Sequence, residues 1–143
     1  DMASTATPLV MVIDDSMCVR KVVELSLKNV GISTIAFPDG PSALQAFSSG
    51  QVAPPRVLLL DIGMPRMTGY DVAKLLRNRD EFADTSIIMI SSHNGVLDRA
   101  RSLLIGRVDF ISMPFFRDEL VRRVRRALGI LDPTLDTSLD WPE

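Results

Sequence analysis

The sequence predicts an α/β fold: one five-stranded parallel sheet, doubly wound with helices in a (βα)5 arrangement. Short uncharged apolar runs alternate with segments of helical periodicity five times along the chain. Such runs are typical of strands buried in parallel sheets. The connections between them are too short for anything but strand–helix–strand units, whose right-handed crossovers cover both faces of the sheet. A length of 143 residues with 46% hydrophobic content supports one globular domain with a core.

The first two strands and helices are indicated by apolar runs and by their end signals. Residues 8–13 form an uncharged run that predicts the first strand. The following segment is apolar at helical spacing, with Ser16 as the expected N-cap and Gly31 as the expected stop. Ile32 to Phe37 predicts the second strand. Turn residues then lead to Pro41, which suits an early position in the second helix.

Two further strands are expected in the middle of the chain. Residues 56–61 form an apolar run that ends in a carboxylate, and residues 86–91 form a second apolar run without charged residues. Between them, residues 64–69 are expected to form a loop, followed by a helix with apolar residues at positions 72, 73, 75 and 76.

The last third of the chain predicts a short helix at residues 95–105, a fifth strand at 106–112 and an amphipathic final helix. That helix has apolar residues from Leu120 to Leu131 on one face and four arginines mostly opposite. Residues 1–7 are expected to be an N-terminal extension. Residues 132–143, with two prolines and four acids, are expected to be an acidic tail or linker.

Acidic residues close two of the predicted strands. Asp14 and Asp15 follow the first strand, and Asp61 ends the third. Because open α/β sheets bind ligands in the crevice at the carboxyl ends of their strands, these side chains are expected to lie together. Crowded carboxylates repel one another unless a cation lies between them, and Mg²⁺ suits a set of oxygen ligands. The sequence therefore predicts a Mg²⁺ site.

Composition excludes several classes of protein. The single cysteine, Cys18, excludes an internal disulfide and fits a reducing compartment; it is expected to pack rather than react. No apolar stretch approaches the roughly 20 residues that span a bilayer. The first residues have neither the basic flank nor the apolar core of a signal peptide. A cytoplasmic protein without membrane association is the expectation.

Charge is distributed unevenly although the net charge is only −2. Residues 99–126 hold eight arginines against three acids, a net charge of +5. The last twelve residues carry four acids and no basic residue. An acidic partner surface would complement the arginine-rich segment.

A set of short motifs recurs at the ends of the predicted strands. They are Asp14-Asp15-Ser16, Asp61 with Met64-Pro65 and Gly69, Ser91-Ser92, Gly106, Asp109-Phe110 and Pro114-Phe115. Together these motifs resemble the receiver domain of bacterial two-component response regulators, over residues of about 8–131. The resemblance implies a CheY-like, flavodoxin-like sheet with strand order 2-1-3-4-5.

The resemblance implies that Asp61 accepts a phosphoryl group from a sensor histidine kinase or a phosphotransfer protein. Asp15, Asp61 and the backbone carbonyl of Gly63 would bind Mg²⁺, with Asp14 acting through water. The implied role of Asp61 is chemically sound, because an ionised carboxylate is a competent covalent phosphoryl acceptor. Catalysis of this kind is mainly positioning and electrostatics.

By the same resemblance, Ser91 would hydrogen-bond the phosphoryl group and Phe110 would be the aromatic switch residue. Met113 departs from the family, which has lysine before the proline. The lost charge leaves the acids less balanced, so Mg²⁺ is expected to stabilise the domain. The bond between Met113 and Pro114 is expected to be cis, as the resemblance implies.

The leading interpretation is a phosphoacceptor switch, with no enzymatic activity beyond self-phosphorylation and autodephosphorylation. The alternative is a pseudo-receiver, a protein-interaction module that Met113 has uncoupled from phosphorylation. A phosphatase with an aspartyl-phosphate intermediate is disfavoured. Such an enzyme is expected to have Asp-x-Asp after the first strand, where this chain has adjacent Asp14 and Asp15.

The resemblance also implies where partners bind. An output partner or effector domain would dock on the face formed by helix 95–105, strand 106–112 and the last helix. Direct binding to DNA is disfavoured, because no helix-turn-helix or other reading module follows.

Overall fold

The structure is a computed structural model that describes residues 10–91 and 108–130. These residues form one five-stranded parallel sheet in the order β2-β1-β3-β4-β5, which confirms the predicted fold class and strand order. The helix expected at 95–105, the N-terminal extension expected at 1–7 and the tail or linker expected at 132–143 lie outside the described residues. The strands are β1 (Val10–Ile13), β2 (Thr34–Phe37), β3 (Val57–Asp61), β4 (Ser86–Ser91) and β5 (Val108–Ser112).

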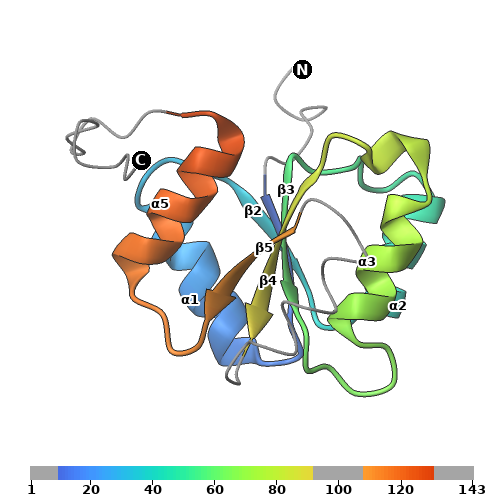
Figure 1. The fold of residues 1–143 in the computed structure, drawn as a ribbon, viewed down its shortest axis with the longest axis horizontal. Coiled ribbons are helices and arrows are strands. Elements are labelled where there is room, and N and C mark those ends of the chain that lie inside the picture. The colour runs from blue at the N-terminus through green and yellow to red at the C-terminus, as the bar shows by residue number, and fades with distance from the viewer. Residues whose placement is uncertain (1–9, 92–107, 131–143) are drawn as a thin grey trace, which may run out of the picture.

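Helices cover both faces of the sheet (Figure 1). Helices α1 (Met17–Lys28) and α5 (Arg117–Leu128) lie on one side, and α2 (Gly40–Ser48) and α3 (Gly69–Arg77) lie on the other. A 3₁₀ turn, η2 (Asp80–Phe82), precedes β4 and was not predicted from the sequence. The three inner strands are buried along their apolar residues, whereas the edge strands β2 and β5 are partly exposed.

The pleat of the strands sends alternate side chains into two cores. The α1/α5 cluster consists of Val10, Val12, Val23, Leu27, Ile32, Val57, Leu59, Ile88, Ile90, Ile111, Leu120, Val121, Val124 and Leu128. The α2/α3 cluster consists of Met11, Ile13, Ala43, Leu58, Leu60, Met64, Tyr70, Val72, Ala73, Leu76, Phe82, Ile87 and Met89. Any residue of the sheet can therefore be assigned to a face by its neighbours in these clusters.

Side-chain caps fix where the helices begin. Ser16 caps α1, as predicted, by accepting a hydrogen bond from the Val19 amide at 3.2 Å. Asp39 caps α2 by accepting from the Ser42 amide at 2.8 Å. A capping box between Thr68 and Asp71 begins α3. The first and third of these caps follow directly after the loops that carry the acidic residues, so they hold those loops in place.

Two expectations for the start of the chain are wrong. Strand β2 begins at Thr34 rather than at Ile32, because the Ile32 amide donates to the Leu27 carbonyl at 2.9 Å and so closes the end of α1. Cys18 is exposed rather than packed, since α1 turns Val19 and Val23 toward the core instead.

The Met113–Pro114 peptide bond is cis, which confirms the expectation for this bond. Among residues 10–91 and 108–130, the structure has no helix that is long and apolar enough to cross a membrane.

Gly69 lets the first turn of α3 approach the end of β3. A Cβ atom at Gly69 would lie 2.5 Å from the Asp61 carbonyl oxygen and 2.9 Å from the Ile62 Cα. The Gly69 amide also donates to the Ile62 carbonyl at 3.2 Å. The backbone at the end of β3 therefore lies so close to residue 69 that a side chain does not fit there.

We expect the substitution Gly69→Ala to lower the free energy of unfolding by about 1–3 kcal/mol, the usual cost of overpacking. Gly63→Ala is the matched control, because its Cβ would meet nothing closer than 3.8 Å. That control should stay within about 0.5 kcal/mol of the wild type. Urea unfolding measures both values, and equal stability of the two variants would contradict the close approach.

Candidate functional site

Three carboxylates meet at the carboxyl edge of the sheet, as the sequence predicted. Strand β1 ends at Ile13, so Asp14 and Asp15 follow it directly, and Asp61 is the last residue of the neighbouring strand β3. One oxygen from each side chain lies within 4.8 Å of the others. Asp14 is buried, Asp61 is half-buried and Asp15 is exposed.

Asp14 forms the floor of this group of acids. Its side chain is only 3% exposed, and its Oδ1 accepts a hydrogen bond from the Ser16 amide at 2.8 Å. Burial raises the pKa of Asp14, the Ser16 hydrogen bond opposes that rise, and the neighbouring charge of Asp15 adds to it. The Ser16 amide, at the start of α1, therefore helps to hold the buried Asp14 carboxylate in place.

Asp61 has the most strongly perturbed carboxyl group of the cluster. Its burial raises the pKa of Asp61 to about 7, with further increases from Asp14 and Asp15. A hydrogen bond from the Gly63 amide to Asp61 Oδ1, at 3.0 Å, works in the opposite direction. Without a cation, Asp61 is therefore only partly ionised at neutral pH.

Arg20 is a participant that sequence reasoning missed. Its Nη1 donates to the backbone carbonyl of Asp14 at 2.8 Å, and its positive charge lowers the pKa of the Asp14 carboxyl. The signal was available, because a basic residue six positions after Asp14 lies in the first turns of the helix that starts beside the acids. Arg20 therefore offsets part of the negative charge of the acid cluster.

The remaining predicted site residues lie around the ends of β4 and β5. Ser91 ends β4 as predicted, is buried, and accepts a hydrogen bond from the Met113 amide to its carbonyl at 2.7 Å. The Met113 side chain packs, partly buried, against the α1/α5 cluster. Phe110 packs, partly buried, against the α2/α3 cluster on the other face. Their predicted roles toward Asp61 stay predictions.

The donor set suits a hard divalent cation. It consists of carboxylate oxygens, the ligands that Mg²⁺ prefers, and its exposed member leaves one side open for the waters that Mg²⁺ usually retains. Burial raises the pKa of Asp61 and the charges of Asp14 and Asp15 add to that rise, so a cation beside these carboxylates would favour the ionised form of Asp61. For Gly63, the described contact is made by its amide, so the predicted carbonyl ligand stays a prediction.

Comparison with known proteins gives one consistent result. A family model described as the response regulator receiver domain matches residues 10–125. Protein PilG of Pseudomonas aeruginosa is 36% identical over 124 residues, which cover 87% of this chain and 90% of that protein. The probable transcriptional regulator ycf27 of Cyanophora paradoxa is 34% identical over 130 residues, and the chain spans about half of its length (52%).

Similarity to solved structures agrees with the sequence comparison. The chemotaxis protein CheY4 of Vibrio cholerae superposes with a TM-score of 0.76 at 26% sequence identity. The match covers 85% of this chain and 99% of that protein.

The raised pKa of Asp61 predicts how stability depends on pH. The folded protein binds this proton more tightly than the unfolded chain, whose carboxyl has a pKa near 3.8. Without divalent cations, the contribution of Asp61 to the free energy of unfolding should therefore fall as pH rises from about 4 to about 7 and then level off. Near pH 8, Asp61→Asn should melt about 3 °C or more above the wild type, because it removes the buried charge.

Thermal unfolding in EDTA at several pH values measures this difference. It should shrink toward zero as the pH falls below 3.8, because the Asp61 carboxyl is then mostly protonated in both the folded and the unfolded protein. Asp84→Asn, at an exposed acid in the turn before β4, is the control and should follow the wild type. Parallel pH profiles for the wild type and Asp61→Asn would show that Asp61 has an ordinary pKa.

Millimolar Mg²⁺ should raise the melting temperature of the wild type near pH 8, because a ligand that binds only the folded state stabilises it. Asp61→Asn and Asp15→Asn should gain less, since each removes one ligand and one charge. Sodium chloride at matched ionic strength separates binding from general screening. A wild-type melting temperature that Mg²⁺ leaves unchanged would contradict an intact metal site.

Proposed function

The chain belongs to the family of response regulator receiver domains, and we propose that it is a phosphorylation-controlled switch in which Asp61 accepts the phosphoryl group. We propose residues 8–131 as the extent of this domain. Receiver domains act in two-component signalling with histidine kinases or phosphotransfer proteins and with output domains, and are in general signalling modules rather than enzymes. The observation that carries the proposal is the convergence of Asp14, Asp15 and Asp61 within 4.8 Å at the end of two neighbouring strands.

The proposed chemistry is a transfer to an oxygen of Asp61. This oxygen forms a bond to phosphorus while the bond between phosphorus and the donor's leaving group breaks, and the leaving group keeps the electron pair. Hydrolysis later returns the carboxylate and inorganic phosphate. Only the ionised form of Asp61 is the nucleophile. Asp15, Asp61 and the Gly63 carbonyl would hold Mg²⁺, with Asp14 acting through water, and the bound ion would offset the charge of the acids and of the transferring oxygens.

Ser91 and Phe110 are proposed to read the state of Asp61. The Ser91 hydroxyl would donate a hydrogen bond to the phosphoryl group, and its position at the buried end of β4 supports this role. Phe110 would change its rotamer when that hydroxyl is engaged. Its ring is only partly buried against the α2/α3 cluster, which supports a side chain that can change its packing.

Met113 weakens this switch at one point. It has neither a donor nor a charge for the phosphoryl oxygens, whereas lysine at this position would provide a charge-assisted hydrogen bond worth about 1.5–3 kcal/mol. We therefore propose that phosphorylation of Asp61 is retained but couples weakly to the output face.

A second candidate function is a pseudo-receiver that binds partners without phosphorylation. The packing of Met113 against the α1/α5 cluster favours it, because this side chain contributes to the core instead of to the charge balance of the site. The acid cluster would then be inherited but unused in signalling.

The partners are proposed from charge and position. Arginines on α5, with Arg126 exposed and Arg122 partly exposed, favour an output partner with an acidic surface on the face that includes β5 and α5. We propose that the output acts through protein contact rather than through direct binding to DNA. The helix expected at 95–105, which completes this proposed face, lies outside the described residues.

The direct test is phosphorylation by acetyl phosphate with Mg²⁺, followed by intact-mass measurement. The wild type should gain one phosphoryl group and Asp61→Asn should gain none. Met113→Lys should gain the group as well, and its aspartyl phosphate should have a different lifetime, because the added ammonium contacts the phosphoryl oxygens.

Two other outcomes separate the candidates. A gain in Met113→Lys but not in the wild type would favour the pseudo-receiver. If neither folded protein gains mass, Asp61 is not a phosphoacceptor and the proposed function is wrong.

A further inference from the structure

Phe110 lies on the outer edge of the sheet, with its backbone polar groups turned away from the neighbouring strand. The Met113 amide donates to the Ser91 carbonyl on β4. In a parallel pair, alternate residues of a strand bond to the same neighbour, so Ile111 and Asp109 share the orientation of Met113. Phe110 has the opposite orientation, and its N–H and C=O point outward from β5.

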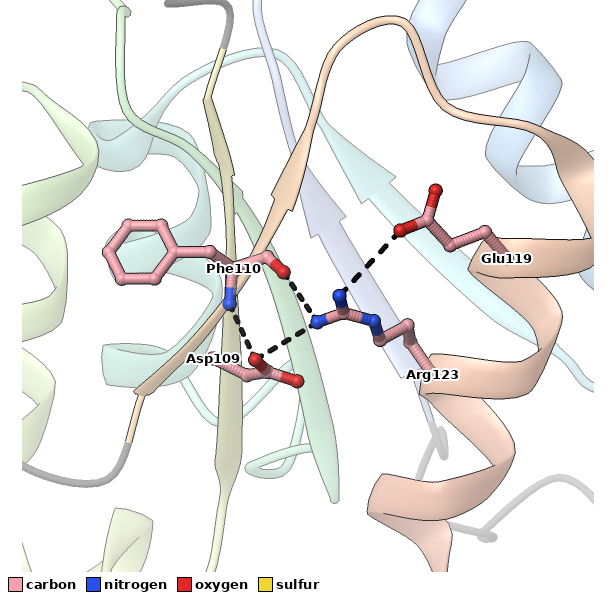
Figure 2. Close-up of polar contacts among 4 residues, drawn as sticks. All are labelled: Asp109, Phe110, Glu119 and Arg123. Atoms are coloured by element: carbon pink, nitrogen blue, oxygen red, sulfur yellow. Dashed lines mark hydrogen bonds and ion pairs between the residues drawn. The ribbon is translucent and has the colours of Figure 1, made fainter. Parts of the chain in front are cut away.

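Two charged side chains bind these outward groups (Figure 2). Asp109 Oδ1 accepts a hydrogen bond from the Phe110 amide at 2.8 Å, and Arg123 Nη1 donates to the Phe110 carbonyl at 2.6 Å. Arg123 Nη1 also donates to Asp109 Oδ1 at 3.0 Å, which closes a ring around the backbone of one residue of the edge strand. Both backbone groups of Phe110 are therefore satisfied without a further strand.

Arg123 is itself held by α5, the helix from which it extends. Its Nη2 lies 3.6 Å from Glu119 Oε2, one helical turn earlier. The planar guanidinium thus contacts a carbonyl and two carboxylates in different directions, a pattern that one lysine ammonium does not reproduce. The Arg123 side chain is 28% exposed, so these contacts are only partly screened by solvent.

The side chain of Phe110 lies on the other side of the sheet from α5. It packs with the α2/α3 cluster, and Figure 2 shows its ring directed away from Arg123. Helix α5, by contrast, contributes to the α1/α5 cluster. Arg123 is therefore a direct connection between α5 and a residue whose ring belongs to the opposite face.

We propose that Arg123 is a positioning residue that couples the exposed surface of α5 to the packing of Phe110. This inference rests on the proposed function, in which Phe110 responds to the state of Asp61. A partner carboxylate that paired with Arg123 would compete with Asp109 and with the Phe110 carbonyl and would release the backbone of Phe110. By linkage, a change at Phe110 would alter the binding of that partner to α5 by the same factor.

The test compares Arg123→Gln with Arg126→Gln, which removes the same charge from the same helix one turn on, at an exposed position. NMR of the Phe110 ring and amide reports its rotamer and its hydrogen exchange. Acetyl phosphate labelling reports the lifetime of the aspartyl phosphate. A merely structural role of Arg123 would change the melting temperature without a new Phe110 rotamer population.

Arg123→Gln should shift the Phe110 rotamer population and speed exchange of its amide. It should also change the aspartyl-phosphate lifetime at least about five-fold, the lower end of typical coupling between sites. Arg126→Gln should leave all three values within about two-fold. Arg123→Lys, which retains the charge, should give intermediate values, and it carries the comparison if Arg123→Gln does not fold.

Unchanged Phe110 signals and lifetime in both Arg123 variants would overturn the inference. If the wild type accepts no phosphoryl group, the proposed function fails separately. The Phe110 signals then still decide whether Arg123 positions this residue.

Discussion

Mutual repulsion among three carboxylates at one edge of the sheet is the constraint on which the rest of the site depends. Their oxygens lie within 4.8 Å of one another, and burial raises the pKa values of Asp14 and Asp61. The surrounding contacts favour the ionised acids and so oppose this rise in pKa. The Ser16 amide donates to Asp14, the Gly63 amide donates to Asp61, and Arg20 adds a positive charge. Met113, at the position where the resemblance led us to expect lysine, adds no positive charge.

The doubly wound sheet places the acid cluster and the contact with α5 on strands of different kinds. Asp61 ends the inner strand β3, which pairs with β1 and β4, and Asp61 itself pairs with β4 and is closely approached by Gly69. The edge strand β5 has a free side, and the ring of Asp109 and Arg123 joins that side to α5. The buried inner strands therefore provide rigid positions for the chemistry, and the edge strand provides a place where helix and sheet can influence each other.

The parts of the structure that depend on periodicity and chain direction were predictable from the sequence. Uncharged runs identified the inner strands, and the shared direction of parallel strands brought Asp14, Asp15 and Asp61 together. Contacts made by long side chains were not predictable, because they depend on rotamers and on tertiary neighbours. Arg20 reaches back to the Asp14 carbonyl, and Arg123 reaches across thirteen positions to Phe110. The start of β2 was misplaced because the Ile32 amide completes α1 instead of beginning a strand.

The central claim is that the cluster holds an excess of negative charge that a cation relieves, and the carboxyl carbon of Asp61 reports on it directly. A ¹³C NMR titration of the aspartate carboxyls, with and without Mg²⁺, gives the pKa of Asp61 in both states. Without Mg²⁺, Asp61 should titrate at about 7, and saturating Mg²⁺ should lower that pKa strongly, because the metal favours the ionised form. Titration of Asp61 near its ordinary value in both conditions would contradict the account.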